Sequence, residues 1–428
     1  MKKEIFISLT VFSIIILISL SAGAAVDAET IGLGEDFSTI ESETAFFSNP
    51  AGLALRENDF AVKANTGFSI WNNIFNNSEF TEDEIESKLT GEELIIAGRG
   101  VYGTQFYYKN FALGVNGKAE GMLETDSDAT EILTADEPKI TFEDGEANLE
   151  TVTADFNVTR GGAADVSDIS LSYAVPISKN ILDNLNQNRK NKIEGVYFGA
   201  AYHYLEGDIY KFAGEGTITA TEEESGVNYT ISKDSSEAIL DDDAAGIYSM
   251  RTEDGSASGD VFDLGMTVKW EEKYTFAVSI MNIGKLEADS YTIKADQYKA
   301  DGDSLKESSI EEETVNESIT YELPQILRLG GKMNYSESTV FYAEYSQVSY
   351  DIGRDDNVIA LGSEFRRNKF IPLRLGLNYS SLREDTEISS GIGLNFKNMK
   401  INMGIADLGA LFDDAKSVKF GLSSTLAF

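Results

Sequence analysis

The segment that ends the chain constrains the fold more than any other. From Lys419 onward, Phe420, Leu422, Leu426 and Phe428 alternate with small and polar residues. A transmembrane β-barrel requires this period-two alternation, because each strand faces hydrocarbon on one side and the lumen on the other. A half-buried strand of a soluble β-sandwich alternates in the same way. This segment alone therefore predicts strand structure and leaves both all-β architectures open.

The amino terminus has the pattern of a secretory signal peptide. Two lysines precede an apolar run from Ile5 to Leu20, and small residues follow it. This order predicts a signal peptide at residues 1–24. Cleavage after Ala28 and an uncleaved anchor are the alternatives, since the apolar run is long for a signal peptide. After Leu20 no apolar run approaches the roughly 20 residues of a transmembrane helix, so integration into a membrane would have to use strands.

The composition is strongly acidic. The chain has 72 Asp and Glu against 35 Lys and Arg, a formal net charge of −37. A negatively charged protein repels the phosphate backbone of a nucleic acid, so no nucleic-acid partner is expected. Acidic blocks such as 222–224 and 241–243 lie among Gly, Ser and Thr, and they predict solvated loops rather than metal sites. No segment has the spacing of a calcium-binding loop. We expect neither a metal nor a cofactor.

The predicted strands are joined by short turns and long connections in alternation. The short turns lie at 109–110, 178–193, 271–273, 336–338, 367–369 and 397–398. The longest polar connections lie at 71–93, 125–166, 207–259 and 284–324. A bacterial outer-membrane barrel has short periplasmic turns and long outer loops. The alternation therefore predicts such a barrel, with its acidic connections on the outside of the cell.

The segments add up to about fourteen antiparallel strands, an even number as a closed barrel requires. They predict a barrel over residues 58–428. Region 125–166 is open to two interpretations, a protruding hairpin or two further barrel strands. Short helices are predicted after the capping box of Thr81 and Glu84, and at 181–188.

Aromatic residues gather beside the short turns, where a membrane barrel carries an interfacial girdle. Core aromatics at strand ends of a soluble sheet are the alternative. The predicted girdle consists of Phe106, Tyr107, Tyr108, Phe111, Trp270, Tyr274, Tyr335, Phe341, Phe365, Phe370, Phe396 and Phe428.

Catalytic chemistry has little support in the sequence. His203 is the only histidine, there is no cysteine, and no nucleophile-elbow, metalloprotease or phosphate-loop motif occurs. His203 lies on a predicted strand, where a residue facing the lumen or the membrane interface is the simpler interpretation. We therefore expect a protein that is not an enzyme.

The stretch before the first strand contains Asn49-Pro50-Ala51-Gly52-Leu53. It resembles a segment of the FadL family of outer-membrane transporters and of their PorV-type relatives. Two later stretches, Phe276 to Gly284 and Leu323 to Gly331, resemble the PorV-type branch. The resemblance implies a fourteen-stranded barrel with an amino-terminal hatch in its lumen, here residues 25–57. Separately, the aromatic terminus at Phe428 resembles the terminal signal that outer-membrane assembly machinery reads.

The residue types of the motif suit a plug. Pro50 biases Asn49 to extended backbone, Asn49 closes an Asx turn, and Gly52 is expected to let the backbone approach the barrel wall. A turn before the first strand, without a transport role, is the alternative. Inward glycines such as Gly376, Gly391, Gly393 and Gly404 suit a crowded lumen, although a tightly wound small barrel would use them too.

Three functions follow from this interpretation. The first is passive uptake of small hydrophobic or amphipathic molecules across the outer membrane, with membrane lipid and a hydrophobic ligand as partners. The second is a PorV-like or conjugation-associated accessory barrel that binds an exported protein and transports nothing. An outer-membrane lipase is disfavoured, because no pair of nucleophile and base stands out. The ligand-binding residues are not identifiable from the sequence.

Overall fold

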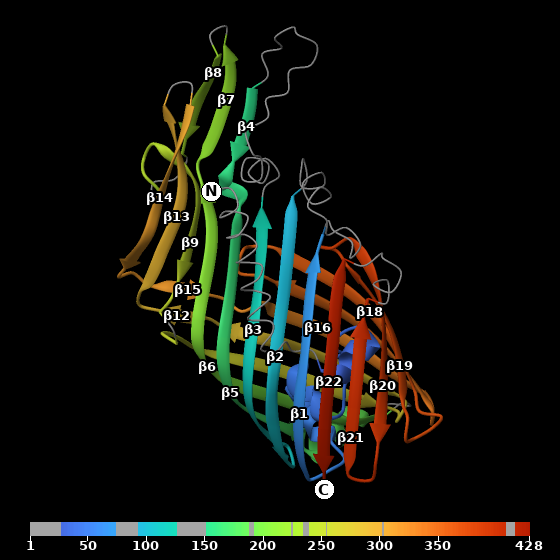
Figure 1. Ribbon diagram of the computed structural model, residues 1–428. Helices are drawn as coiled ribbons and strands as arrows, with labels where there is room; N and C mark the ends of the chain where they lie inside the picture. The colour runs from blue at the N-terminus through green and yellow to red at the C-terminus, as the bar shows by residue number, and fades with distance from the viewer. Residues whose placement is uncertain are drawn as a thin grey trace, which may run out of the picture.

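The computed structural model describes residues 27–73, 93–125, 151–187, 192–223, 226–233, 239–253, 255–301, 304–407 and 416–428. In these residues a closed antiparallel barrel of fourteen strands dominates the molecule, and β22 pairs with β1 to close it (Figure 1). The barrel strands are β1 (Phe60–Asn72), β2 (Leu94–Tyr108), β3 (Phe111–Thr125), β5 (Arg160–Pro176), β6 (Ile193–Glu215), β10 (Ala257–Trp270), β11 (Tyr274–Gly284), β16 (Gln325–Ser336), β17 (Thr339–Ser349), β18 (Asp355–Phe365), β19 (Leu373–Ser380), β20 (Asp385–Asn395), β21 (Met399–Ala406) and β22 (Ser417–Ala427). The predicted transmembrane barrel is confirmed. The predicted signal peptide and the helix after Thr81 lie outside the described residues.

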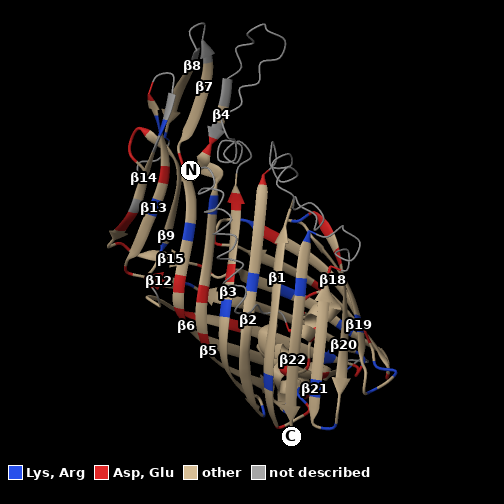
Figure 2. Cartoon of the chain, in the orientation of Figure 1, with Lys and Arg blue, Asp and Glu red and all other residues tan. Residues whose placement is uncertain are grey.

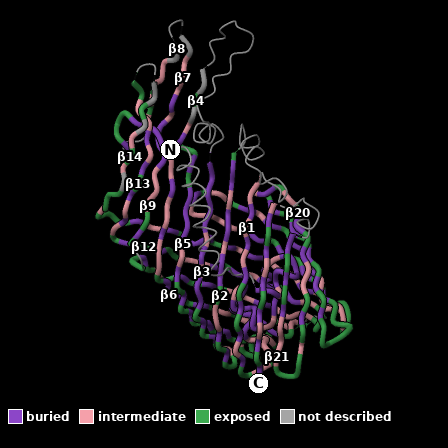
Figure 3. The backbone as a smooth tube through the Cα atoms, in the orientation of Figure 1, coloured by how far each residue is buried: buried purple, intermediate pink, exposed green. Residues whose placement is uncertain are grey.

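The barrel wall has an apolar outer face and a polar inner face. On β19, Leu373, Leu375 and Leu377 are exposed on the outside, whereas Arg374 and Asn378 are buried on the inside. The same alternation runs along the strands around the barrel (Figure 3). It matches a wall between lipid and lumen. Most residues of the predicted aromatic girdle are exposed, but the prediction is wrong for Tyr107, which is fully buried and donates a hydrogen bond to the Glu43 carbonyl oxygen.

The N-terminal segment, residues 27–57, lies inside the barrel (Figure 1). It contains the helix α2 (Ala28–Leu33) and the 3-10 turns η2 (Glu43–Phe47) and η3 (Pro50–Leu55). The helix packs against β19 to β22, and η3 packs against β5, β6 and β10 on the other side. Asp27 caps the helix through a hydrogen bond from the Glu29 amide, and Gly34 ends it in the left-handed conformation.

Strands extend the wall beyond the end of the barrel that carries the long connections, called here the loop end. Residues 210–215 of β6 leave β10 and pair with β9 (Ala244–Arg251), followed by β13 (Tyr291–Asp301) and β14 (Ser304–Val315). Short strands β12 (Leu286–Ala288) and β15 (Ile319–Tyr321) pair beside them. A separate sheet joins β4 (Thr151–Asp155), β7 (Thr217–Glu223) and β8 (Gly226–Ser232).

These sheets correct the prediction that the connections 207–259 and 284–324 are unpacked outer loops. Of the acidic blocks predicted as solvated loops, 241–243 lies in an exposed turn, whereas 222–223 belong to β7. The apolar residues of these sheets alternate with the charged ones and form two packed clusters, one around Phe156 and Phe212 and one around Leu205 and Leu286. In the described part of region 125–166, β4 belongs to the separate sheet, and the turn η4 (Phe156–Val158) follows β4. The described residues of this region therefore add no further barrel strand.

The predicted helix at 181–188 is present as α5 (Lys179–Asn186), at the opposite end of the barrel, called here the turn end. Among the described residues, none of the helices has the length and apolar character that crossing a membrane requires.

Candidate binding site in the barrel lumen

The segment from Asn49 to Leu53 adopts the local geometry expected from its residue types. Asn49 is extended, with φ −164° and ψ 105°, and its Oδ1 accepts a hydrogen bond of 3.0 Å from the Ala51 amide. Its Nδ2 donates to Thr267 Oγ1 of β10 at 3.0 Å. Pro50 opens η3, where the missing amide hydrogen is not needed. Asn49 therefore closes the turn and binds the turn to the wall.

The expectation for Gly52 is wrong in detail. A side chain at Gly52 would collide with the Ile40 carbonyl and with Ala45, so Gly52 packs within the N-terminal segment rather than on the wall. The close approach to the wall is made by glycines of the strands instead. A Cβ at Gly265 would collide with Asn49, and one at Gly199 with the Pro50–Ala51 backbone.

The inward glycines of the last strands make room for α2. A Cβ at Gly376 would collide with the Leu33 carbonyl, and Cβ atoms at Gly391 and Gly404 would collide with the backbone of α2. Gly393 does not belong to this set, because its neighbours are Pro372 and Asn402 of the barrel itself. The crowded lumen expected from Gly376, Gly391 and Gly404 is therefore present.

Ion pairs hold the N-terminal segment to the wall. Asp27 pairs with Lys63, and the Glu29 carboxylate lies 3.5 Å from Arg374. The Glu41 carboxylate lies 3.1 Å from Lys332. Burial raises the pKa of Glu29, but the neighbouring cations, Arg374 first, outweigh burial and lower that pKa to about 2. Burial is likewise outweighed at Glu41, whose pKa is lowered by Lys332 and Lys269. Glu29 and Glu41 are therefore ionised at neutral pH, and the three ion pairs anchor the segment.

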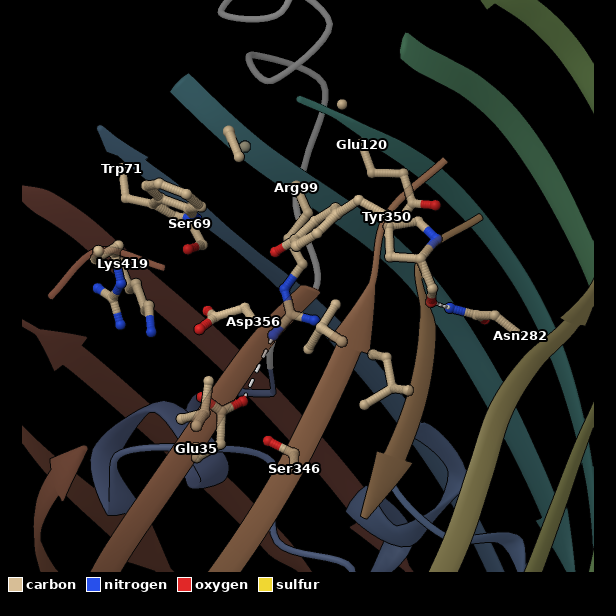
Figure 4. A pocket seen from close by; sticks show the side chains of 18 of the residues that line it. Glu35, Ser69, Trp71, Arg99, Glu120, Asn282, Ser346, Tyr350, Asp356 and Lys419 are labelled. Atoms are coloured by element: carbon tan, nitrogen blue, oxygen red, sulfur yellow. Dashed lines mark hydrogen bonds and ion pairs between the residues drawn. The ribbon is translucent and has the colours of Figure 1, made fainter. Parts of the chain in front are cut away.

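Two adjoining cavities lie on the loop-end side of the N-terminal segment, with volumes of about 780 and 670 Å³ that include space open to solvent. They share the lining residues Arg99, Glu120, Asn282, Ile326 and Arg328. In the first cavity, Arg99 extends toward Glu35 from one wall, with Glu120 and Tyr350 beside it (Figure 4). Apolar side chains complete the lining, among them Trp71, Phe46 and Ile326. The site is amphipathic, with charges of both signs.

A third cavity, of about 1,560 Å³ including open space, lies at the turn end. Its lining includes Glu29, Glu41 and Thr44 of the N-terminal segment together with Lys332 and Lys400 of the wall. The N-terminal segment therefore has cavities on both sides. Charged residues of both signs occur along the barrel strands as well as at the two ends (Figure 2).

His203 belongs to a closed polar cluster beside the second cavity. Its Nδ1 lies 3.0 Å from Asp168 Oδ1, and its Nε2 lies 2.9 Å from Asp263 Oδ2. Lys118 pairs with Asp168 at 2.8 Å. Both ring nitrogens face carboxylates, so the ring is held as a structural cation rather than as a free base. Among the described residues no cluster of His, Asp and Glu has the arrangement of a metal site.

Sequence reasoning did not identify the cavity residues Arg99, Glu120 and Arg328. The available signal was a charge at an inward position of an otherwise apolar strand, as in Leu327-Arg328-Leu329.

The C-terminal residue Phe428 is 65% exposed, and its backbone forms hydrogen bonds with the backbone of Phe60. Recognition of Phe428 by outer-membrane assembly machinery stays a prediction.

No protein family model matches this chain, and none of the curated proteins matches it in sequence. Solved structures are similar in fold. The toluene transporter TbuX of Ralstonia pickettii is 14% identical, with a TM-score of 0.51 over 95% of this chain and 98% of its own. The toluene transporter TodX of Pseudomonas putida is 13% identical, with a TM-score of 0.51 over 95% of this chain and 99% of its own. A FadL homologue of Pseudomonas aeruginosa is 12% identical, with a TM-score of 0.51 over 95% of this chain and all of its own, 100%.

Sequence identities this low support a shared fold but do not identify a ligand, because proteins of one fold have different functions. The structural neighbours are transporters and channels rather than enzymes. The chain has the closed fourteen-stranded barrel fold of FadL-type outer-membrane hydrocarbon transporters.

Proposed function

We propose that this protein lies in the outer membrane and mediates passive uptake of small hydrophobic or amphipathic molecules, with residues 25–57 as the hatch. The position of the N-terminal segment carries the proposal. It separates the cavities at the loop end from the cavity at the turn end. A shift of this segment would join them into a path through the barrel. The similarity to FadL-type transporters supports the same function.

Part of the contact between the hatch and the wall is exchangeable with water. It includes hydrogen bonds, such as Ser38 Oγ donating to Glu344 at 3.0 Å and Ser279 Oγ donating to the Ser48 carbonyl at 2.7 Å, beside apolar packing of the hatch on Val340 and Tyr342. Water can replace the hydrogen-bond partners at a modest net free-energy change, so the apolar packing and the buried ion pairs set the cost of moving the hatch. In this proposal residues 1–24 direct export, and assembly machinery recognises Phe428.

A reversible cross-link tests the hatch. The chain has no cysteine, and a Cβ added at Gly330 would collide with Ser38 Oγ and with Glu344 Oε2. Ser38→Cys with Gly330→Cys therefore places the two thiols side by side once the Glu344 side chain shifts. In proteoliposomes, oxidation should stop uptake of a small amphipathic solute, and reduction should restore it. Each single-cysteine variant is the control. Equal uptake by the oxidised and reduced double variant would contradict a moving hatch.

A PorV-like accessory barrel is the second candidate, because the loop-end sheets are packed structures rather than simple loops. They offer a rigid surface for an exported protein. The cross-link distinguishes the two candidates. An accessory barrel would keep its partner with the hatch locked, whereas a transporter would lose its uptake.

A further inference from the structure

Arg328 on β16 is a buried cation with unused hydrogen-bonding capacity. The residue is 1% exposed and lines both loop-end cavities. Its Nη2 donates to Asp36 Oδ2 at 3.3 Å, but Nε and Nη1 have no hydrogen-bond partner among the described residues. Buried donors without partners are unfavourable, and a guanidinium offers a fork that matches a carboxylate. Arg328 therefore has a vacant position for an anionic group.

Arg99 lies close to Arg328 and is weakly paired. Its Nη2 is 3.5 Å from the same Asp36 Oδ2 atom and 3.8 Å from Glu35, longer than well-formed ion pairs. The side chain of Arg99 is 31% exposed in the cavity. Two guanidinium groups thus share one carboxylate oxygen, Glu35 lies only at long range from Arg99, and a further carboxylate would complete the pairing.

Glu120 supplies the opposite charge in the same place. It lies directly across from Arg99 in the β2–β3 register and lines both cavities. Its Oε1 is buried and has no hydrogen-bond partner in the described part of the chain. Directly opposed residues have Cβ atoms about 5 Å apart, so Glu120 leaves the wall beside Arg99, and it lines the same two cavities as Arg328.

Other charged groups in the first cavity already have partners. Arg383 pairs with Glu387 at 2.5 Å and donates to Asn378 at 3.1 Å. Lys419 pairs with Glu387 at 3.0 Å. Glu35 accepts from the Asp36 amide at 3.2 Å, and Asp356 accepts from Ser380 Oγ at 2.9 Å. Among the described charged groups of this cavity, the vacant positions are therefore those of Arg328, Arg99 and Glu120.

We infer that the loop-end cavities bind a small amphipathic zwitterion. Its carboxylate pairs with Arg328 and Arg99, its ammonium group donates to Glu120, and its apolar body lies against side chains such as Ile326 and Trp71. The vacant groups have both signs, so a neutral hydrocarbon would leave all of them unpaired. This inference rests on the proposed function and specifies its class of ligand.

A matched series of probes tests the ligand class. Phenylalanine carries both charged groups, 3-phenylpropanoate only the carboxylate, phenethylamine only the ammonium, and ethylbenzene neither. Calorimetric titration of the purified full-length protein in detergent should give the tightest binding for phenylalanine. Each removed charge should weaken binding about tenfold or more. Ethylbenzene binding as tightly as phenylalanine would overturn the inference.

Arg328→Gln and Lys332→Gln form a matched pair of variants. Both residues lie on β16, both are buried, and both pair with the N-terminal segment, but Lys332 lines the turn-end cavity. Arg328→Gln should weaken phenylalanine and 3-phenylpropanoate about tenfold and leave phenethylamine unchanged. Lys332→Gln loosens the N-terminal segment without removing a group from the loop-end cavities, so it should change the binding of all three probes by the same factor. The same charge-selective loss in both variants would overturn the site.

Failure of this inference differs from failure of the proposed function. If the probe series and Arg328→Gln show no charge preference while the cross-link still controls uptake, the protein transports another class of ligand. If the charge preference holds while the cross-link has no effect on uptake, the site binds a zwitterion and the proposed hatch movement is wrong.

Discussion

The outer and inner faces of the same barrel strands obey different rules. Outside, Leu373, Leu375 and Leu377 are exposed and largely interchangeable, because lipid chains accept any apolar side chain of roughly this size. Inside, Arg374 must meet Glu29 and Glu364, and Gly376 must leave room for Leu33. The outer face therefore needs only the correct period. The inner face needs particular partners.

The largest effect is expected for a buried ion pair of the inner face. In Lys63→Met, Asp27 would remain buried without its cation, and breaking such a pair costs about 3–5 kcal/mol. Because the pair joins the N-terminal segment to β1, this segment should exchange its amide hydrogens faster while the barrel strands keep their protection. Unchanged exchange in residues 27–57 would show that the pair does not anchor the segment.

On the outer face, Leu375→Lys should destabilise the barrel by about 2–4 kcal/mol, because a charge near the middle of the membrane is poorly solvated. Equilibrium unfolding in lipid vesicles measures this change. The control is Phe370→Lys, next to a short turn, where the expected change is about 0–1 kcal/mol. Equal effects at both positions would contradict the assigned depth of β19.

A small inner residue tests packing without charge. Gly376→Val should push against the Leu33 carbonyl and destabilise the packing of the N-terminal segment by about 1–3 kcal/mol. The expected readout is a higher leak of small solutes through the barrel in planar bilayers. Gly331→Val is the control, because its Cβ would meet only Phe276 at 4.0 Å. A leak in both variants would point to damage of the wall itself.

Acid should loosen the N-terminal segment. The pKa of Glu29 is about 2 in the folded protein, below its ordinary value of 4.5. Its ionised form therefore contributes stability above about pH 4.5, and this contribution is lost as the pH falls toward 2. Solute leak should rise over this interval. Glu29→Gln should show the leak already at neutral pH and a weaker dependence on acid.

The smallest effect is expected for an exposed pair. Lys285 and Glu287 lie 3.1 Å apart and both are about half exposed. Lys285→Ala should change the free energy of unfolding by less than about 1 kcal/mol, and added salt should remove even that difference. A larger change would show that the loop-end sheets depend on surface charge.

Several features were predictable from the sequence for local reasons. The strands from Tyr274 to Gly284 and from Met399 to Ala406 alternate with a clear period, and short polar turns join them to their neighbours. The Asx turn at Asn49 follows from the residues on either side of it. Each of these features depends on residues close together in the chain.

The loop-end strands were not predictable in the same way. β13 and β14 are rich in charge, and β13 pairs with β9, about forty residues earlier in the chain. Their apolar residues become a core only once β6 has extended beyond the barrel to receive them. Charge density alone therefore gave the wrong prediction of unpacked outer loops.

The barrel could be predicted from the sequence, because period-two alternation and turn lengths act locally and lipid accepts many side chains. Which charges meet in the lumen depends on the tertiary structure. Asp36, Arg99 and Arg328 are far apart in the chain, and the closed barrel with the N-terminal segment inside brings them to one carboxylate oxygen. Pairing of buried charges depends on distances that closure of the barrel sets, and no local pattern encodes those distances.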